Sequence, residues 1–333
     1  MKVLVTGGGG FLGQALVRRL LERGDQARLF ARGDYPSLVE AGAEGVRGDL
    51  RDASAVQGAV KGCDAVVHCA AMIGDGGRFR DFYRTNVVGT QNVIAACRAH
   101  AVSRLVFTSS YSVVHGGEDL EGVDETHPYP QRHLAHYPHT KALAEQEVLA
   151  ANDATLATVS LRLHLVWGPG DTQLLPRAIA RARAGTLRFP KGPAKRIDCT
   201  YIDDAVNAHL LALDRVAPGA PCAGRAYFIT QGTPLPMKEL VTRVLGSVGV
   251  PPPPEGPFTP RSLYLAGSLI EAAYRLPGLR GREPPLTRFL ARQVTTAHWF
   301  DISAARRDLG YQPTVTIEEG LRCLAADPRL RGL

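Results

Sequence analysis

Met1-Lys-Val-Leu-Val-Thr-Gly-Gly-Gly-Gly-Phe-Leu-Gly-Gln14 is the stretch that decides the fold. Its apolar run, residues 3–5, predicts a buried parallel strand, and the apolar residues that recur over 11–21 predict a helix. Between them, three glycines stand three residues apart: Gly7, Gly10 and Gly13. A glycine turn between a strand and a helix is typical of a dinucleotide site, where the pyrophosphate lies on the helix N-terminus. We expect these glycines to form the tight turn, admit the phosphates and let the helix approach the strand.

The composition indicates an ordinary globular protein. The chain has 333 residues and a formal net charge of +7, which favours an anionic ligand such as a phosphorylated cofactor or a carboxylate. Lys and Arg form no block or aromatic-interleaved stripe, so we expect no nucleic-acid partner. The six cysteines are scattered without a Cys-x-x-Cys pair, which predicts buried thiols in a reducing, cytoplasmic compartment and no metal site. No apolar run reaches the roughly 18–20 residues that a membrane span needs.

Strand and helix patterns alternate along the first half of the chain. They predict an α/β fold: a Rossmann, doubly wound parallel sheet with a smaller, mainly helical C-terminal substrate domain. We expect the nucleotide-binding domain to span 1–165, with later returns near 197–230. The substrate-binding region is expected over 166–196 and 231–333.

Several helix predictions bear on this arrangement. A continuous helix is expected from Asp81 to His100. The apolar segments 263–276 and 286–294 are expected as helices that form a lid or substrate wall. The piece around 263–270 is expected as a core helix, with peripheral contact to a membrane surface or lipid-like substrate as the open alternative. Asp203 or Asp204 is expected to cap a helix over 205–213.

The end of the predicted second strand, residues 26–31, indicates which nicotinamide cofactor binds. NAD-specific proteins place an acidic residue there, whereas NADP-specific proteins avoid the acid and offer Arg. This strand ends at Ala31 and is followed by Arg32, so we predict NADP(H), with Arg32 on the 2′-phosphate. Asp34, beyond a glycine, is the competing candidate. An Arg32 that merely caps the strand and faces water is the alternative.

Two further strand ends are expected beside the cofactor. Asp49 follows the predicted third strand and is placed to bond the adenine amino group. Ala70 and Ala71 follow the fourth strand, and their small side chains leave room for a ligand at the carboxyl edge of the sheet.

A tyrosine and a lysine at helical spacing are the candidate catalytic pair. Tyr137 and Lys141 are four residues apart, so their side chains share one helix face. An ammonium next to a phenol lowers its pKa, and such a phenol can exchange a proton with a carbonyl or alcohol oxygen. Ser110, at the end of the fifth strand, is the candidate to hold that oxygen, with Ser109 and Ser112 as rivals.

Taken together, these residues resemble the extended short-chain dehydrogenase/reductase family. The shared positions are Thr6, Gly7, Gly10, Gly13, Asp49, Leu50, Ala70, Ala71, Asn86, Ser110, Tyr137, Lys141, Gly168 and Pro169. The resemblance implies that cofactor binding also involves Phe11, Leu12, Leu50 and Asn86.

The resemblance also implies catalytic roles. Tyr137 would protonate the forming alkoxide, Lys141 would lower its pKa and hold the nicotinamide ribose, and Ser110 would bond the substrate carbonyl. The aromatic Tyr111 departs from the family, whose members often have a small residue there. His115 and His164 lie near the expected site, and we expect both to be buried structural histidines.

Within the family, segments 108–114 and 137–141 look most like the 3β-hydroxysteroid dehydrogenase branch. Segments 31–36, 112–117 and 150–157 resemble its bacterial β-keto acid reductases of long-chain olefin biosynthesis. This implies NADPH-dependent reduction of the 3-keto group of a long-chain 2-alkyl-3-ketoalkanoic acid, a fatty β-keto acid. It also implies a homodimer and an assembly with olefin-pathway enzymes.

Other functions stay open on the same residues. A 3β-hydroxysteroid or sterol dehydrogenase needs the same catalytic set and an apolar pocket. A nucleotide-sugar epimerase needs a polar pocket for its nucleotide, which the Leu- and Pro-rich second half does not indicate. A silent NADP sensor would be expected to lose Tyr137 or Lys141, and this chain keeps both.

Overall fold

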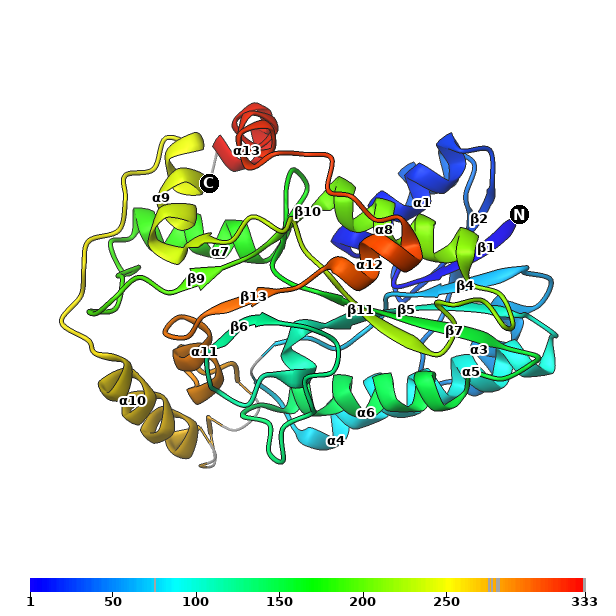
Figure 1. Ribbon diagram of the computed structural model, residues 1–333, viewed down its shortest axis with the longest axis horizontal. Coiled ribbons are helices and arrows are strands. Elements are labelled where there is room, and N and C mark those ends of the chain that lie inside the picture. Colours follow the sequence, from blue (N-terminus) through cyan, green and yellow to red (C-terminus); the bar gives the residue numbers. More distant parts are fainter. Residues whose placement is uncertain (75, 275, 277, 280–281, 332–333) are drawn as a thin grey trace.

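The computed structural model describes residues 1–74, 76–274, 276, 278–279 and 282–331. Its central sheet has seven parallel strands in the order β11-β7-β5-β4-β1-β2-β3 (Figure 1). Their bounds are β1 (Lys2–Thr6), β2 (Gln26–Ala31), β3 (Glu44–Arg47), β4 (Ala65–His68), β5 (Arg104–Ser110), β7 (Ala157–Leu163) and β11 (Arg225–Ile229). The strand order reverses between β1 and β4, which is where such sheets bind their ligands. The predicted Rossmann, doubly wound α/β fold is confirmed.

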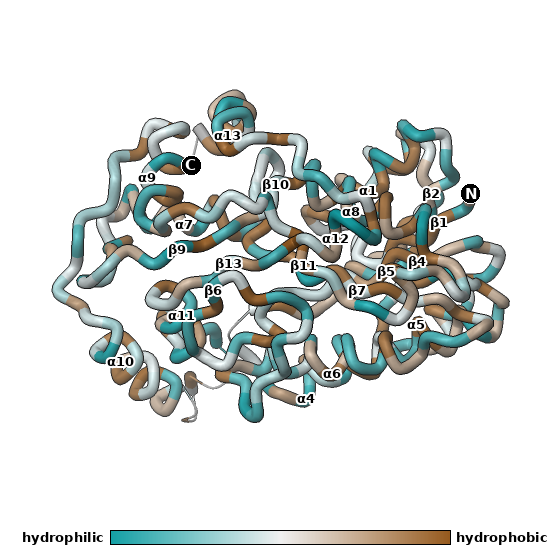
Figure 2. Tube along the Cα trace, viewed as in Figure 1, coloured by the Kyte–Doolittle hydropathy of each residue, from teal (hydrophilic) through white to brown (hydrophobic). Residues whose placement is uncertain are grey.

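Helices cover both faces of this sheet (Figure 1). One layer holds α3 (Ala53–Val60), α5 (Gly89–Ala99) and α6 (His136–Ala150), and the other holds α1 (Phe11–Glu22), α8 (Ile202–Arg215) and α12 (Ser303–Leu309). The short helix α2 (Pro36–Glu40) follows β2. Figure 2 shows the central strands as the apolar interior between these helices.

Alternation along β1 explains why both faces are covered. Successive side chains of a strand point to opposite faces. Val3 and Val5 pack in one apolar cluster with Leu16 of α1, and Leu4 packs in the other with Val56 of α3. A strand buried on both sides reads as a continuous apolar run, which is the pattern seen in the sequence.

The C-terminal region contains short strands as well as helices. Its helices are α7 (Leu174–Arg183), α9 (Met237–Ser247), α10 (Pro260–Ala273), α11 (Arg288–Gln293), α13 (Ile317–Ala326) and α14 (Pro328–Arg331). A second sheet has the order β12-β9-β13-β6, from β6 (Leu120–Val123), β9 (Arg196–Ile197), β12 (Leu235–Pro236) and β13 (His298–Phe300). A third pairs β8 (Val166–Trp167) with β10 (Thr200–Tyr201). Thus β6, from the first half of the chain, pairs with the region expected to bind substrate.

Helix α10 differs from the expected core helix. Only Gly267 is buried in it, where the chain lies against the backbone of Thr287. Leu265 and Leu269 are 63% and 73% exposed. The core prediction was wrong because an apolar pattern does not show whether a second layer covers it. The predicted end of this helix includes Arg275, which lies outside the described residues.

The helix expected from Asp81 to His100 is interrupted. It begins as α4 (Phe79–Phe82), passes through a π-helical turn, η1 (Tyr83–Val88), and continues as α5. Such turns are rare and often lie at functional sites. Here the π-helical turn carries Asn86.

The capping prediction for α8 was also wrong. The helix begins at Ile202, so Asp203 and Asp204 lie in its first turn instead of at the N-cap. The buried Asp204 carboxylate accepts hydrogen bonds from the backbone N–H (2.7 Å) and the hydroxyl (2.9 Å) of Thr314. It therefore holds the C-terminal segment against the Rossmann sheet. Within the described residues, no helix is long and apolar enough to cross a membrane.

Candidate active site

The glycine turn is shaped by close backbone approaches. Gly7 has φ +69°, and a Cβ there would lie 2.8 Å from the backbone of Ala70. A Cβ on Gly13 would lie 2.1 Å from the carbonyl oxygen of Gly7, so α1 approaches β1 more closely than any side chain allows. Gly10 is different, because a Cβ there would touch only that same oxygen, at 3.3 Å. Gly10 therefore borders open space.

The turn opens into one large cleft of about 1290 Å³. The cleft brings together thirteen of the fourteen predicted site residues: Gly7, Gly10, Phe11, Leu12, Gly13, Arg32, Asp49, Leu50, Ala70, Ala71, Ser110, Tyr137 and Lys141. They come from the ends of β1 to β5, from the first turn of α1 and from α6, so the carboxyl edge of the sheet gathers them. Their individual roles stay predictions.

The cleft fits a dinucleotide. Helix α1 has Gly10 as N-cap with no side-chain cap, and no acidic residue lies in its first turn. The first N–H groups of the helix are therefore available to an anion where Gly10 leaves room. The cleft continues from this helix end to Tyr137 and Lys141, which lie on a different element. When bound, a nicotinamide cofactor would supply or accept a hydride there.

Where the cleft meets the ends of β2 and β3, arginines surround the strand ends. Arg32 is exposed and lines the cleft, whereas Asp34 does not line it and pairs with Arg47 at 3.6 Å. The Asp49 carboxylate already accepts two hydrogen bonds from the Arg51 guanidinium, at 3.0 and 2.6 Å. That hydrogen bonding lowers the pKa of Asp49. Sequence reasoning did not single out Arg51, which also lines the cleft.

Asn86 is the predicted residue that the cleft does not include. It is 2% exposed, and its amide bonds the backbone N–H (2.7 Å) and carbonyl (3.0 Å) of Met72. Its Nδ2 also donates to the Thr140 hydroxyl at 3.0 Å. The amide is fully used in holding the segment after β4 against α6, so Asn86 can support the site only indirectly.

Lys141 is held by strand β5. Its side chain is buried, Nζ donates to the carbonyl oxygen of Thr108 at 2.6 Å and lies 3.9 Å from the centre of the Phe107 ring. Burial lowers the pKa of Lys141 to about 7, and Glu145 acts in the opposite direction. A buried ammonium that is only partly charged at neutral pH is sensitive to any charge near it.

Tyr137 differs from the expected tuning. Burial raises the pKa of the Tyr137 phenol, and only a hydrogen bond with Ser110 opposes that rise. The expected lowering by Lys141 is not seen in the free protein. A phenol that stays protonated at neutral pH is suited to donate a proton, as ketone reduction requires.

The three serines occupy different places. Ser110 and Ser109 line the cleft, and Ser112 does not. The Ser110 and Ser112 hydroxyls lie 2.9 Å apart, and Ser110 Oγ also accepts the Ser112 backbone N–H at 3.2 Å. The Ser109 side chain lies next to the Glu145 carboxylate. This arrangement favours Ser110 as the partner of a substrate oxygen.

Tyr111 and the histidines lie behind the cleft. The Tyr111 ring packs against His115, His164 and His298, and its hydroxyl accepts a hydrogen bond from Gln293 at 3.1 Å. All three histidines are 0% exposed and none lines the cleft. As expected, His115 and His164 are buried. They support the segment that carries Ser110.

Several cleft residues were missed from the sequence. Tyr35 covers the glycine turn so closely that a Cβ on Gly9 would lie 1.8 Å from its ring. Cys69 accepts a hydrogen bond from the Thr108 hydroxyl at 3.0 Å, and burial raises its pKa to about 11. A mostly apolar wall is formed by Met72, Ile73, Leu163, Leu165, Val166 and Leu174. Among these residues, only Tyr35, which stands directly before Pro36, had a pattern in the sequence by which it could have been found. Within the described ranges, no cluster of His, Cys, Asp or Glu could hold a metal ion.

Comparison with known proteins identifies the family of this chain. The sequence matches the profile of the 3-beta hydroxysteroid dehydrogenase/isomerase family over residues 4–258. A 2-alkyl-3-oxoalkanoate reductase of Stenotrophomonas maltophilia is 54% identical, over 98% of this chain and 99% of the relative. The reductase of the same name from Shewanella oneidensis is 43% identical, over 97% and 85%. The solved structure of MoeE5 with UDP-glucuronic acid and NAD has a TM-score of 0.76 at 26% identity, over 100% of both chains.

Proposed function

Because the chain belongs to the 3-beta hydroxysteroid dehydrogenase/isomerase family, we propose that it is an NADPH-dependent reductase of long-chain 2-alkyl-3-ketoalkanoic acids. The reaction adds hydride to the 3-keto carbon and a proton to its oxygen, giving the 3-hydroxy acid and NADP⁺. The observation that carries the proposal is one cleft that joins Ser110, Tyr137 and Lys141 to an apolar wall. The relatives named 2-alkyl-3-oxoalkanoate reductase supply the substrate class.

The chain's own residues perform the proton chemistry in this proposal. The Ser110 hydroxyl and the Tyr137 phenol both donate hydrogen bonds to the keto oxygen. As negative charge develops on that oxygen, Tyr137 transfers its proton to it. Lys141 stabilises the charge that remains on the phenolate. The wall formed by Met72, Ile73, Leu163, Leu165, Val166 and Leu174 takes the alkyl tails and excludes water.

NADPH preference is proposed from Arg32. No acid stands at Ala31 to compete with a 2′-phosphate, and the exposed Arg32 faces the same part of the cleft. The acid nearest to Arg32 in the sequence, Asp34, is paired with Arg47. A guanidinium suits a phosphate because it donates two parallel hydrogen bonds.

The experiment is a side-by-side turnover assay. β-Keto acids lose carbon dioxide in solution, so oxidation of a synthetic 2-alkyl-3-hydroxy acid by NADP⁺ is measured beside reduction of the fresh keto acid. NAD⁺ and a 3-hydroxysteroid are the comparison cofactor and substrate. Turnover of the fatty acid with NADP⁺, lost in Tyr137→Phe, is expected. No turnover of the fatty acid by the folded protein would overturn the proposal.

A 3β-hydroxysteroid dehydrogenase is the second candidate, favoured by the family to which the chain belongs. The same apolar wall would contact a sterol ring system. Turnover of the steroid alone would leave the roles of the catalytic residues unchanged and would show that the substrate is a sterol instead of a fatty keto acid. The predicted homodimer and the predicted assembly with olefin-pathway enzymes stay proposals, and the mass in solution by light scattering tests the first.

A further inference from the structure

A buried carboxylate continues the spacing of the catalytic helix. Tyr137, Lys141 and Glu145 follow one another at intervals of four residues on α6, so they share one face. Glu145 is 0% exposed, which is rare for a carboxylate unless it is paired. The roles proposed so far do not involve it.

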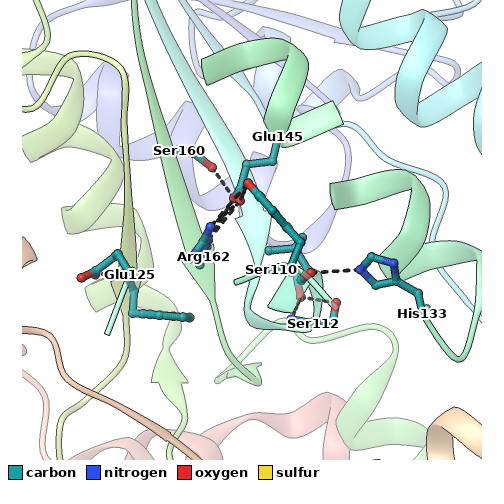
Figure 3. Close-up of polar contacts among 10 residues, drawn as sticks. Ser110, Ser112, Glu125, His133, Glu145, Ser160 and Arg162 are labelled. Atoms are coloured by element: carbon teal, nitrogen blue, oxygen red, sulfur yellow. Dashed lines mark hydrogen bonds and ion pairs between the residues drawn. The ribbon is translucent and has the colours of Figure 1, made fainter. Parts of the chain in front are cut away.

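The Glu145 carboxylate accepts hydrogen bonds from three side chains, of which Figure 3 labels Ser160 and Arg162. The Arg162 guanidinium of β7 donates to its Oε1 through Nε at 3.0 Å and Nη2 at 2.8 Å. The Ser160 hydroxyl donates to Oε2 at 2.7 Å, and the Tyr129 hydroxyl donates to Oε1 at 2.7 Å. These partners outweigh burial and lower the pKa of Glu145, so the carboxylate is charged at neutral pH.

The network joins the elements that carry the candidate catalytic groups. Arg162 pairs in register with Ser109 of β5, the residue before Ser110. Glu145 comes from the same helix as Lys141, and Tyr129 lies in the segment that leads to that helix. The carboxylate therefore lies behind the place where β5 meets α6.

Lys141 has no carboxylate partner of its own. Within the described part of the chain, no ion pair joins its Nζ to an acid within 4.0 Å, and its printed hydrogen bond goes to the Thr108 carbonyl. The ammonium is nonetheless buried, so its charge must be stabilised through space. Glu145, one turn along the same helix, is the acid whose charge acts on it.

The other titratable groups facing Lys141 are neutral. Burial lowers the pKa of His68 to about 3 and that of His209, beside Thr108, to about 4. The Cys69 thiol and the Tyr137 phenol keep their protons, because burial raises both pKa values. Glu145 is therefore the charged side chain that acts on Lys141.

We propose that Glu145 is a positioning residue of the active site: fixed by Arg162, its carboxylate keeps the Lys141 ammonium charged and directed at the end of β5. Glu145 touches neither substrate nor cofactor, and it acts through Lys141. The importance of this charge for turnover rests on the proposed function. The electrostatic coupling itself is a property of the free protein and is measured without substrate.

Variants that remove or keep the charge on Glu145 give a test of its effect on Lys141. The protein, with its six lysines labelled with ¹³C at Cε, is titrated by NMR without cofactor, and the Lys141 signal is assigned with Lys141→Arg. Glu145→Gln removes the attracting charge and is expected to lower the pH midpoint of Lys141. Arg162→Gln leaves the buried Glu145 carboxyl without the guanidinium that lowers its pKa, so this carboxyl is expected to bind a proton and the Lys141 midpoint is expected to fall here too. A purely structural role would not make the Lys141 midpoint follow the charge on Glu145.

Matched variants keep the test decisive. Glu147→Gln, on the exposed side of the same helix, is expected to leave the midpoint unchanged. Glu145→Asp keeps the charge and is expected to stay near the wild-type midpoint, so the test stays decisive if Arg162→Gln fails to fold. Folding of each variant is checked by cooperative thermal unfolding. An unchanged Lys141 midpoint in folded Glu145→Gln overturns the proposal.

Turnover is measured on the same variants with the holoenzyme. The alkaline limb of the kcat profile is expected to move to lower pH in Glu145→Gln and to stay in place in Glu147→Gln. A moved NMR midpoint with an unmoved profile would overturn the positioning role. Failure of the proposed substrate to react is a separate outcome, because the titration of the free protein does not depend on substrate.

Discussion

Lys141 and Thr108 are joined by a hydrogen bond of 2.6 Å from the ammonium to the backbone carbonyl. Since Thr108 stands two residues before Ser110 on β5, this bond ties the helix that carries Tyr137 to the strand that carries the serine. The distance between the two candidate donors to a substrate oxygen is thereby set by a buried contact. The predictions below concern the groups on either side of it.

Removing the Tyr137 hydroxyl is expected to abolish proton transfer while leaving the cleft intact. Tyr137→Phe should lower kcat by roughly 10²–10⁴-fold, the usual contribution of a general acid. NADPH affinity, measured by fluorescence titration, should change little. Tyr83→Phe, at a partly exposed tyrosine outside the cleft, is the control. Turnover that survives in Tyr137→Phe would contradict the assigned role.

Reversing the charge at Arg32 is expected to change cofactor preference. Arg32→Asp places an acid where a 2′-phosphate would lie and where ribose hydroxyls could be bound instead. The ratio of kcat/KM for NADPH over NADH should fall by at least about tenfold, equivalent to about 1.4 kcal/mol. Arg18→Asp makes the same charge change on the outer face of α1 and should leave the ratio unchanged. If the NADPH/NADH ratio of kcat/KM were unchanged in Arg32→Asp as well as in Arg18→Asp, residues other than Arg32 would have to bind the 2′-phosphate.

Two glycines of the turn are expected to respond differently to alanine. A Cβ on Gly13 would lie 2.1 Å from the Gly7 carbonyl oxygen, so Gly13→Ala should destabilise the fold by about 1–3 kcal/mol. At Gly10 the nearest atom is 3.3 Å away, so Gly10→Ala should fold normally and weaken cofactor binding. Denaturant unfolding and cofactor titration separate the two effects. Equal loss of stability in both variants would show that Gly10 has no special relation to a ligand.

The buried histidines behind Tyr111 are expected to make the free energy of unfolding depend on pH in the acidic range. Burial lowers the pKa of His164 to about 3, against about 6.5 in an unfolded chain. Between these two pH values, His164 is protonated in the unfolded state and neutral in the folded state. The free energy of unfolding therefore falls as pH falls through this window, by about 1.4 kcal/mol per pH unit for this histidine.

The measurement is urea unfolding between pH 4 and 6.5. In His164→Asn the amide can still donate to the Asp198 carbonyl that His164 Nδ1 contacts, and the slope against pH should be reduced by about one proton. His100→Asn, at a partly exposed histidine directly after α5, is the control. An equal slope in His164→Asn and in the wild type would show that His164 is not the group that titrates on unfolding.

Local patterns in the sequence predicted the central sheet and most of the cleft. The turn from β1 to α1 is made by residues that follow one another in the sequence. The shared face of Tyr137 and Lys141 follows from their helical spacing. The roles assigned to Ser110, Tyr137 and Lys141 stay predictions until they are measured. What could be predicted was which residues the carboxyl edge of the sheet would bring together.

Features that depend on distant partners were not predictable. The spacing of Glu145 was visible, but its burial depends on Arg162 and Ser160 from β7 and on Tyr129 from a loop. The exposure of α10 depends on the absence of a covering layer, which no local pattern shows. Asn86 was expected at the cofactor, and the π-helical turn at 83–88 turns its amide to Met72 instead.

Because β6 pairs with β13, the second sheet can form only late in the synthesis of the chain on the ribosome. Asp119, beside β6, accepts the backbone N–H of Ala297, 178 residues further along. Until almost the whole chain has been synthesised, the edge of β6 has no partner, and unpaired edges promote aggregation. The Rossmann core can form earlier, from strands that follow one another closely. Shortened chains that end before residue 298 should therefore fold their nucleotide cleft and still depend on chaperones for solubility.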